Sequence, residues 1–441
     1  VPVWAGDSRT LFYARRRNGK ALTIVRHTLG SPAAADVVVH EEADPAFLVT
    51  LGKTSSGRYI LITAADSQTE EVRIVDADRP TGMPRVLIDR RAGERHEVEH
   101  IADRFIIRTN ADGKRDFRIV EAPVAATGRA QWQEIVAHHE GASIELIQVT
   151  ARHLVRVERR RAQQHVVVRR MSDGVEHEVD LGPAPAAVSI VPGDEFDTNL
   201  VRFTHETMSQ PQRVYDYDME TRQQRLRKIE RIPSGHVPGR YTTERIWAPA
   251  RDGELIPISL LYRRGLRKDG RARVFLHGYG AYGVPTESGF DPKILSLIQR
   301  GFVYAIAHVR GGNELGARWR DNGMMRHKLN SFNDFIDAAA FLTQSGYSAP
   351  GGIVAYGMSA GGLLVGGAVN MRPDLFMGVI AQAPFVDVTN TLLDPTLPLT
   401  PAEWTEWGNP AETKEALETI LAYSPYDNVR RQIYPPMLVT T

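Results

Sequence analysis

Short runs that alternate between apolar and polar residues recur throughout the first half of the chain. Alternation with a period of two is typical of β-strands with one buried face. One such run returns after every 45 to 49 residues or so, a spacing typical of the blades of a β-propeller. The five copies read TLFYARR, RYILITAA, RFIIRTN, HLVRVER and NLVRFTH.

Each of these runs is followed by further strand-like runs joined by Gly, Asp and Asn. The second run of each group reads ALTIVRHTL, EEVRIVDAD, RDFRIVEAP, QHVVVRRMS or QRVYDYDME, and third and fourth sets follow. Four strands per group describe a propeller blade, so we predict a partial β-propeller of about five blades over residues 1–232. A pair of β-sandwiches is the alternative, which the regular period disfavours.

The pattern changes near residue 235, after the proline- and glycine-containing segment RIPSGHVPGRYTTE. Beyond it, strand-like runs such as FVYAIAHVRGG alternate with helix-like runs such as SFNDFIDAAAFLTQSG. This alternation is typical of a parallel sheet covered by helices. We therefore predict a second, α/β domain over residues 233–441, with residues 231–240 as a hinge.

The segment AYGMSAGGLLVGG contains the pattern G-x-S-x-G around Ser359, between a strand-like run and a helix-like run. In α/β-hydrolases this pattern forms the sharp turn that exposes a nucleophilic serine, and its glycines avoid clashes within that turn. A Gly/Ser turn without chemistry is the alternative, but the flanking strand and helix favour a nucleophile.

A nucleophilic serine needs a base, which in α/β-hydrolases is a histidine that follows the serine and an acidic residue along the chain. All 14 histidines precede Ser359, and His327 and His308 are the nearest. The chain begins without Met and ends in the strand-like run MLVTT. We therefore expect an internal fragment whose α/β-hydrolase domain is truncated before the catalytic Asp and His, and which is inactive by itself.

The amino-acid composition limits the classes of partner and cofactor that we expect. The net charge of +1 gives no electrostatic reason to expect nucleic acid or a membrane, and the Arg-rich stretch 156–170 alternates with Val like strands with one solvated face. The chain has no cysteine, which fits a cytoplasmic enzyme and excludes thiolate chemistry. No phosphate-binding loop or metal-ligand motif is present, so we expect no cofactor.

Six motifs give a more specific indication. In order, they are HGYGAYG, HVRGGNELG, SFNDF, GMSAGG, RPDLF and PAEWTEWGNP. From about residue 240 onward the chain resembles the catalytic domain of the prolyl oligopeptidase family, and the last motif resembles oligopeptidase B. The resemblance implies a serine peptidase whose propeller limits entry to short peptides, which oligopeptidase B cleaves after Lys or Arg.

The resemblance also assigns roles by position. Ser359 matches the nucleophile, and the backbone N–H of Ala360 and the hydroxyl of Tyr279 match the two donors to the oxyanion. Tyr282 matches an aromatic residue of the pocket for the residue before the cleaved bond. Plain aromatic packing is the alternative for both tyrosines.

Carboxylates in this pocket would bind a basic substrate side chain. Glu403 matches the family's acidic determinant, but Thr405 replaces a second glutamate, which Glu406 could compensate. Glu287 matches one of two acidic positions for the next substrate residue, and Gly289 occupies the other. Each glutamate could instead be merely solvated.

Two other readings remain open. A post-proline or acylaminoacyl peptidase of the same family would share the serine motif, although the acidic Glu403 points away from both. The chain could also be a non-catalytic propeller that binds a partner protein, but Ser359, its flanking glycines and Tyr279 argue against that reading.

Overall fold

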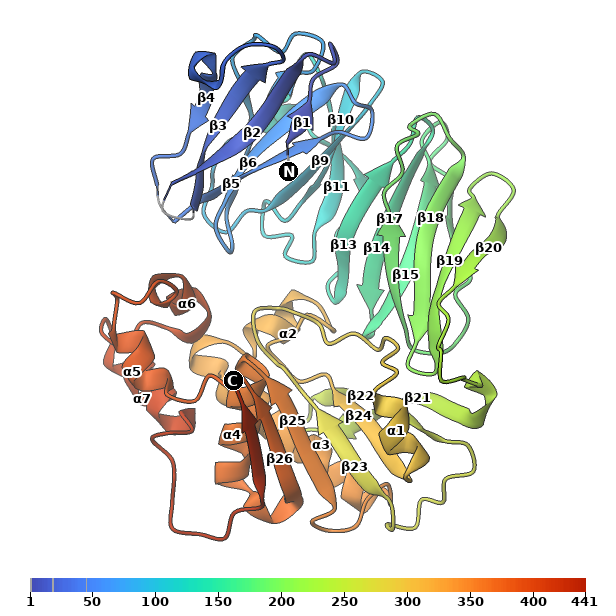
Figure 1. Ribbon diagram of the computed structural model, residues 1–441, viewed down its shortest axis with the longest axis vertical. Helices are drawn as coiled ribbons and strands as arrows, with labels where there is room; N and C mark the ends of the chain where they lie inside the picture. Colours follow the sequence, from blue (N-terminus) through green and yellow to red (C-terminus); the bar gives the residue numbers. More distant parts are fainter. Residues whose placement is uncertain (1, 18–19, 45) are drawn as a thin grey trace.

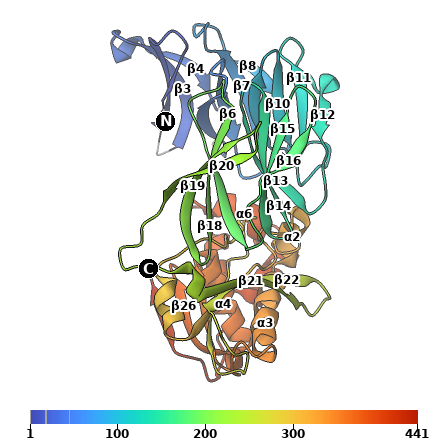
Figure 2. The ribbon, with the colours of Figure 1, turned by 90° about the vertical axis from the view of Figure 1, so that its right-hand side faces the viewer.

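The computed structural model describes residues 2–17, 20–44 and 46–441. Its first half consists of four-stranded antiparallel sheets arranged in an arc, and its second half is a mixed sheet covered by helices. In Figure 1 the arc lies above the mixed sheet, and the chain crosses from one part to the other on the right. Figure 2 shows this crossing from the side, from β20 to β21.

Each blade is a meander in which consecutive strands pair. The first blade contains β1 (Val3–Trp4), β2 (Thr10–Arg17), β3 (Lys20–Thr28) and β4 (Val37–Glu41), and the second contains β5 (Leu48–Lys53), β6 (Tyr59–Ala65), β7 (Glu70–Asp76) and β8 (Arg85–Ile88). The third contains β9 (His96–Ile101), β10 (Arg104–Thr109), β11 (Arg118–Pro123) and β12 (Gln133–Val136). The last two contain β13 (Ala142–Val149), β14 (His153–Arg160), β15 (Gln163–Arg170), β16 (Glu176–Glu178), β17 (Ala186–Val191), β18 (Leu200–Thr207), β19 (Gln210–Asp218) and β20 (Gln223–Ile229).

The core of this half lies between neighbouring blades. Because side chains alternate along a strand, each blade presents one apolar face to the blade before it and another to the blade after it. Phe12 of the first blade packs with Ile60 of the second, for example, and Val155 of the fourth packs with Phe203 of the fifth. Apolar layers of this kind join each successive pair of blades.

The second half is built on a seven-stranded sheet in the order β21-β22-β24-β23-β25-β26-β27. Strands β23 to β27 pair in parallel, whereas β21 and β22 form an antiparallel hairpin at one edge. The bounds are β21 (Tyr241–Pro249), β22 (Leu255–Arg263), β23 (Arg273–His277), β24 (Phe302–Ala307), β25 (Ile353–Met358), β26 (Phe376–Gln382) and β27 (Met437–Thr440).

Helices cover both faces of this sheet. Ala305 and Ala307 of β24 face the cluster that includes α3 and α4, whereas Ile306 faces α1 on the other side. The helices are α1 (Ile294–Gln299), α2 (Ala317–Asp321), α3 (Leu329–Gln344), α4 (Ala360–Met371), α5 (Val388–Leu393), α6 (Thr400–Trp407) and α7 (Lys414–Tyr423). Single 3-10 turns are η1 (Ala33–Ala35), η2 (Arg129–Gln131), η3 (Pro238–Arg240), η4 (Met325–His327) and η5 (Pro373–Leu375).

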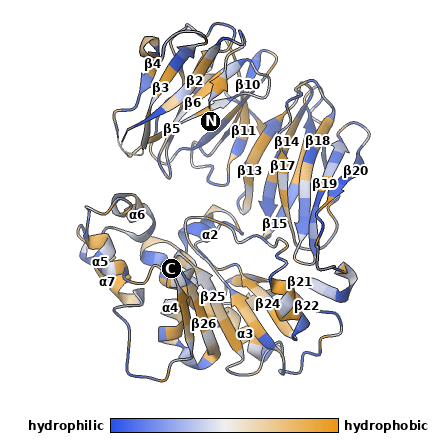
Figure 3. Ribbon diagram, viewed as in Figure 1, coloured by the Kyte–Doolittle hydropathy of each residue, from blue (hydrophilic) through white to orange (hydrophobic). Residues whose placement is uncertain are grey.

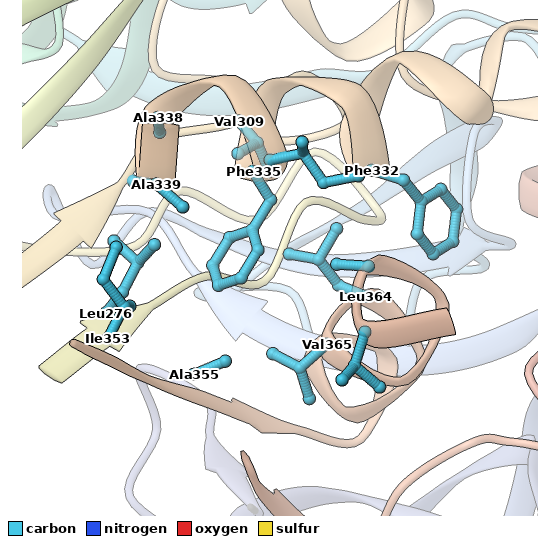
Figure 4. Packing of buried hydrophobic residues seen from close by; sticks show 14 of the residues in the cluster. Leu276, Val309, Phe332, Phe335, Ala338, Ala339, Ile353, Ala355, Leu364 and Val365 are labelled. Carbon is cyan, nitrogen blue, oxygen red and sulfur yellow. The ribbon is translucent and has the colours of Figure 1, made fainter. Parts of the chain in front are cut away.

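The largest apolar cluster lies between this sheet and α3 and α4. Hydrophobic residues concentrate on the central strands, whereas apolar and polar residues alternate along the blades (Figure 3). Figure 4 shows Phe335 of α3 between Leu276 of β23 and Leu364 of α4. The ring of Phe335 also stacks on Phe376, at 6.2 Å between centroids. This layer fixes the ends of β23 and β25, from which the site is built.

The predicted architecture is confirmed as a β-propeller portion followed by an α/β-hydrolase domain. The predicted strands appear, and the structure adds β9, β1 and the short helices α2 and α5 to α7. The boundary predicted at residues 232 and 233 falls between β20 and η3 and stays a prediction, as does the hinge. The Arg-rich stretch does form β14 and β15. The prediction that one of its faces is solvated is wrong in part, because Arg156 and Arg159 are buried against glutamates.

We predict that Phe335→Ala lowers the free energy of unfolding of the α/β domain by about 3–5 kcal/mol, because the fully buried ring leaves a cavity between helix and sheet. Urea denaturation of the 441-residue chain measures this. Gln344→Ala, at the exposed end of the same helix, should change the value by less than about 0.5 kcal/mol. Equal effects of the two substitutions would contradict this account of the core.

Candidate active site

Ser359 stands at the turn between β25 and α4. Its φ of 55° and ψ of −119° lie in a region that non-glycine residues rarely adopt. The backbone is fixed on both sides, since Ser359 N–H donates to Gln382 O (2.9 Å) and Ser359 O accepts from Gly362 N–H (2.9 Å). The residue is exposed, so this strained turn presents its hydroxyl at the carboxyl edge of the parallel strands.

Glycines make this turn sterically possible. A Cβ at Gly357 would lie 1.9 Å from Gly361 O, and one at Gly361 would lie 2.6 Å from Gly278 O. A Cβ at Gly362 would lie 2.5 Å from Cβ of Pro384. Backbone therefore meets backbone directly around Ser359, as the motif predicts.

The two residues predicted as oxyanion donors lie beside Ser359, and their role stays a prediction. Ala360 is the first residue of α4, and its N–H has no acceptor within the described part of the chain. Tyr279, which follows β23, packs beside this turn, since its Cα and Cδ2 lie 3.4 Å from the Cβ position of Gly361. Burial raises the pKa of Tyr279, the charges of Glu403 and Glu406 raise it further, and the nearby Ser359 side chain opposes them. The phenol thus stays protonated and able to donate.

Glu403 lies on α6, and it meets the aromatic residue predicted for the pocket. Its Oε2 accepts a hydrogen bond from Tyr282 Oη (2.7 Å) and another from Trp407 Nε1 (2.5 Å). The rings of Tyr282 and Trp407 meet edge to face at 5.6 Å. Burial and the bond to Glu403 raise the pKa of Tyr282. Oε1 of Glu403 has no hydrogen-bond partner among the residues described.

Glu406 differs from its predicted role. Its side chain is 3% exposed, and its Oε1 accepts the Tyr282 N–H (2.9 Å) and lies 3.7 Å from Nζ of Lys328. In this arrangement the carboxylate faces the protein interior, so it has no exposed oxygen for a substrate side chain. Sequence reasoning missed Lys328, because only the fold brings the start of α3 against α6.

Glu287 lies in the loop after β23, as predicted, but it is already paired. Arg159 of β14 in the propeller forms ion pairs with both Glu287 and Glu145, and its own side chain is only 3% exposed. Glu287 keeps 38% of its side chain exposed. Loss of surrounding water raises the pKa of Glu287, and the Arg159 charge opposes this. Arg159 of the opposite domain therefore pairs with the predicted second acidic position while sharing its charge with Glu145.

The interface between the two halves contains further contacts and two cavities. Asp116 of the propeller accepts the N–H of Ala317 (2.7 Å), and Ala162 N–H donates to Glu314 O (2.9 Å). A cavity of about 480 Å³ is lined by residues of both halves, including Arg95, Asn110, Ser143, Tyr282 and Asn313. A larger one of about 940 Å³ includes Arg115, His138, Met324, Trp407 and Thr413. Beside Glu403, Tyr282 thus borders the smaller cavity and Trp407 borders the larger one.

Within the described ranges no histidine hydrogen-bonds to Ser359. A chain of groups of the right types does exist elsewhere, because Ser259 Oγ shares a hydrogen bond with His308 Nε2 (2.7 Å), and His308 Nδ1 lies 3.4 Å from Glu314. These side chains are buried, and burial lowers the pKa of His308 to about 4. The constellation has no access for a substrate and is structural.

Two kinds of feature are absent from the described residues. They contain no group of three or more His, Asp and Glu side chains arranged for a metal ion. In that same portion, none of the helices has both the length and the apolar character needed to cross a bilayer.

The fold and the turn at Ser359 define a propeller-capped α/β-hydrolase. Residues 1–230 match the family model described as the prolyl oligopeptidase N-terminal β-propeller domain, and residues 288–441 match that of the prolyl oligopeptidase family. The chain belongs to the prolyl oligopeptidase family.

Curated relatives support this membership. The chain is 38% identical to dipeptidyl aminopeptidase BI of Pseudoxanthomonas mexicana, over 100% of this chain and 61% of that relative. It is 32% identical to protease 2 of Moraxella lacunata, over 94% of this chain and 59% of that relative. The chain thus spans about three fifths of the length of these relatives.

Solved structures agree with the fold along the whole chain. Oligopeptidase B from Trypanosoma brucei, in a closed form with covalently bound antipain, aligns with a TM-score of 0.92 and 33% identity. Oligopeptidase B from Leishmania major aligns with a TM-score of 0.92 and 32% identity. Each alignment covers 100% of this chain and 63% of the other.

We predict that Gly357→Ala lowers the free energy of unfolding by about 1–3 kcal/mol or more, because the new Cβ collides with a backbone oxygen that cannot rotate away. Gly128→Ala is the matched control, since nothing lies within 4 Å of its Cβ position and its φ is −58°. Urea denaturation of both variants checks this. A neutral effect of Gly357→Ala would show that the turn is not packed as described.

Proposed function

We propose that this protein is a serine peptidase that hydrolyses short peptides after Lys or Arg. The observation that carries the proposal is Glu403, whose Oε2 is fixed by Tyr282 and Trp407 while its Oε1 stays open. A guanidinium can donate to such an oxygen with a charge-assisted hydrogen bond, and burial strengthens that preference. Tyr279, which packs beside the Ser359 turn, has its ring centre 6.3 Å from that of Tyr282.

The proposed chemistry follows from these positions. Ser359 Oγ attacks the carbonyl carbon of the bond to be cleaved, and its proton passes to a base. Negative charge develops on the carbonyl oxygen, which accepts hydrogen bonds from Ala360 N–H and Tyr279 Oη. The amine then leaves with that proton, and water hydrolyses the acyl-enzyme. The proposed base is a histidine oriented by an acidic residue, as in other α/β-hydrolases, and no histidine follows Ser359 within these 441 residues.

The second acidic position is proposed to have a weaker role. Arg159 already pairs with Glu287, and Gly289 has no side chain at the other acidic position. A Cβ at Gly289 would lie 2.4 Å from Oε1 of Glu206 in the propeller. We therefore expect a clear preference for a basic residue at the cleaved bond and little preference one residue before it.

A cytoplasmic location is proposed from the absence of cysteine.

A second candidate is the release of dipeptides from free N-termini. The relative with 38% identity along the whole chain is named as a dipeptidyl aminopeptidase, which favours this alternative. Two arginine reporters separate the candidates, one with a blocked N-terminus and one with a free amine two residues before the cleaved bond. Cleavage of the free form alone would favour dipeptide release.

We predict that the protein expressed from its complete coding sequence cleaves an Arg reporter and that Ser359→Ala lowers kcat on the order of a millionfold, because the nucleophile is lost. The 441-residue chain alone should show no turnover above that variant. Ser31→Ala, in an exposed turn of the propeller, is the control and should keep full activity. Normal turnover by Ser359→Ala would exclude the proposed nucleophile.

We predict that Glu403→Gln lowers kcat/KM for an Arg reporter by about 100-fold or more, because the substrate cation loses its partner in a desolvated pocket. A neutral reporter should change much less. Glu287→Gln should change kcat/KM by less than about threefold, since Arg159 already compensates that carboxylate. Glu412→Gln, in the larger cavity, is the control. Equal losses for Arg and neutral reporters would contradict the role of Glu403.

A further inference from the structure

The loop that follows β23 has an unusual backbone. Gly280 and Gly283 have φ values of 69° and 65°, and between them Tyr282 has a φ of 59°. This left-handed region suits glycine but is uncommon for a bulky aromatic residue. Such a conformation persists only where surrounding contacts hold it in place.

Two buried charged side chains supply such contacts. Nζ of Lys328 donates to Gly280 O (2.5 Å) and to Gly323 O (3.0 Å). Glu406, on α6, accepts the Tyr282 N–H at 2.9 Å. The two charges lie 3.7 Å apart, and each side chain is 3% exposed. Lys328 and Glu406 therefore bind the backbone of the two residues that flank Ala281 in the sequence.

The same two residues also contact the acidic pocket. Lys328 Nζ lies 4.6 Å from the centre of the Trp407 ring, and Trp407 donates to Glu403. Glu406 and Glu403 belong to the same two turns of α6. The loop, in turn, carries Tyr279 toward Ser359 and Tyr282 toward Glu403. A shift of Gly280 or Tyr282 would displace both groups.

We propose that Lys328 and Glu406 are a positioning pair that holds the loop of residues 278–283 so that Tyr279 faces Ser359 and Tyr282 faces Glu403. The pair thereby couples the oxyanion donor to the pocket for the basic side chain, and this inference rests on the proposed function. Neither residue touches the substrate. Their effect passes through the backbone of the loop.

The cost of burying these charges favours a positioning role. Burial lowers the pKa of Lys328 to about 8, and Glu406 opposes this change. A buried ion pair is seldom a better source of stability than an apolar pair of the same size. What an apolar pair could not provide is a donor to Gly280 O and an acceptor for Tyr282 N–H.

Amide hydrogen exchange tests the inference without any need for catalysis. In the 441-residue chain, the double variant Lys328→Met/Glu406→Met, which removes both the donor to Gly280 O and the acceptor for Tyr282 N–H, should exchange at least 10-fold faster in a peptide covering residues 278–284. A peptide covering β22 should be unchanged. Because the double variant leaves no unpaired buried charge, its melting temperature should stay closer to the wild type than that of Lys328→Met alone.

Kinetics of the complete protein provide the second test. The double variant should lower kcat at least 10-fold through Tyr279 and raise KM for an Arg reporter through Tyr282, even though it folds. Glu244→Gln is the control, since this carboxylate accepts from Tyr262 (2.7 Å) at the far edge of the same domain. It should lower the melting temperature and leave kcat and KM unchanged.

The outcomes distinguish the two proposals. Wild-type exchange in residues 278–284 together with wild-type kinetics in the double variant would overturn the positioning role. Faster exchange in a protein that cleaves no peptide would support the positioning role while rejecting the proposed function. Equal acceleration across the whole α/β domain would also overturn it, because the pair would then only stabilise the fold.

Discussion

Direct contact between backbone atoms of β25 and α4 is the constraint on which the rest of the site depends. A strand can pass into a helix within one residue only if the helix starts against the strand it has just left, and no side chain fits in that space. The Cβ position of Gly357, 1.9 Å from Gly361 O, leaves no latitude there. The same closeness brings α4 against the loop after β23, since Gly361 also abuts Gly278. Strands β23 and β25 are neighbours in the sheet. Tyr279, which follows β23, therefore lies beside Ser359, which follows β25.

The second layer of the site consists of charges that the fold must bury. Arg310 pairs with Asp334 and Lys328 with Glu406, all four of them buried, whereas Arg159 is buried and pairs with the partly exposed Glu287 across the interface. Buried ion pairs contribute little net stability, but they fix geometry because each has few satisfactory arrangements. Apolar packing around Phe335 lies at the centre of the α/β domain, and these polar contacts lie around the candidate site.

Patterns with a local physical cause were predictable from the sequence. Alternation identified the blade strands, and the spacing of glycines around Ser359 identified the turn, because both depend on neighbours in the chain. The partners of Glu406 and Glu287 were not predictable in this way, since Lys328 and Arg159 reach them only after α3 and the propeller have packed. The helix that carries Glu403 was missed for a similar reason. Its amphipathic signal is short, and its residues Glu406 and Trp407 are buried by contacts far away in the chain.

The apolar layers between blades give the propeller half a modular character. Each layer involves only two adjacent blades, so the energy of this half is close to a sum of nearest-neighbour terms. Mutations that accumulate in one layer are therefore felt by its two blades and hardly by the others. The first blade, which shares its apolar layer with the second blade, can drift in sequence more freely than the fourth, whose Arg159 pairs with Glu287 of the domain below. Such a scaffold lets the N-terminal blade evolve separately from the α/β domain.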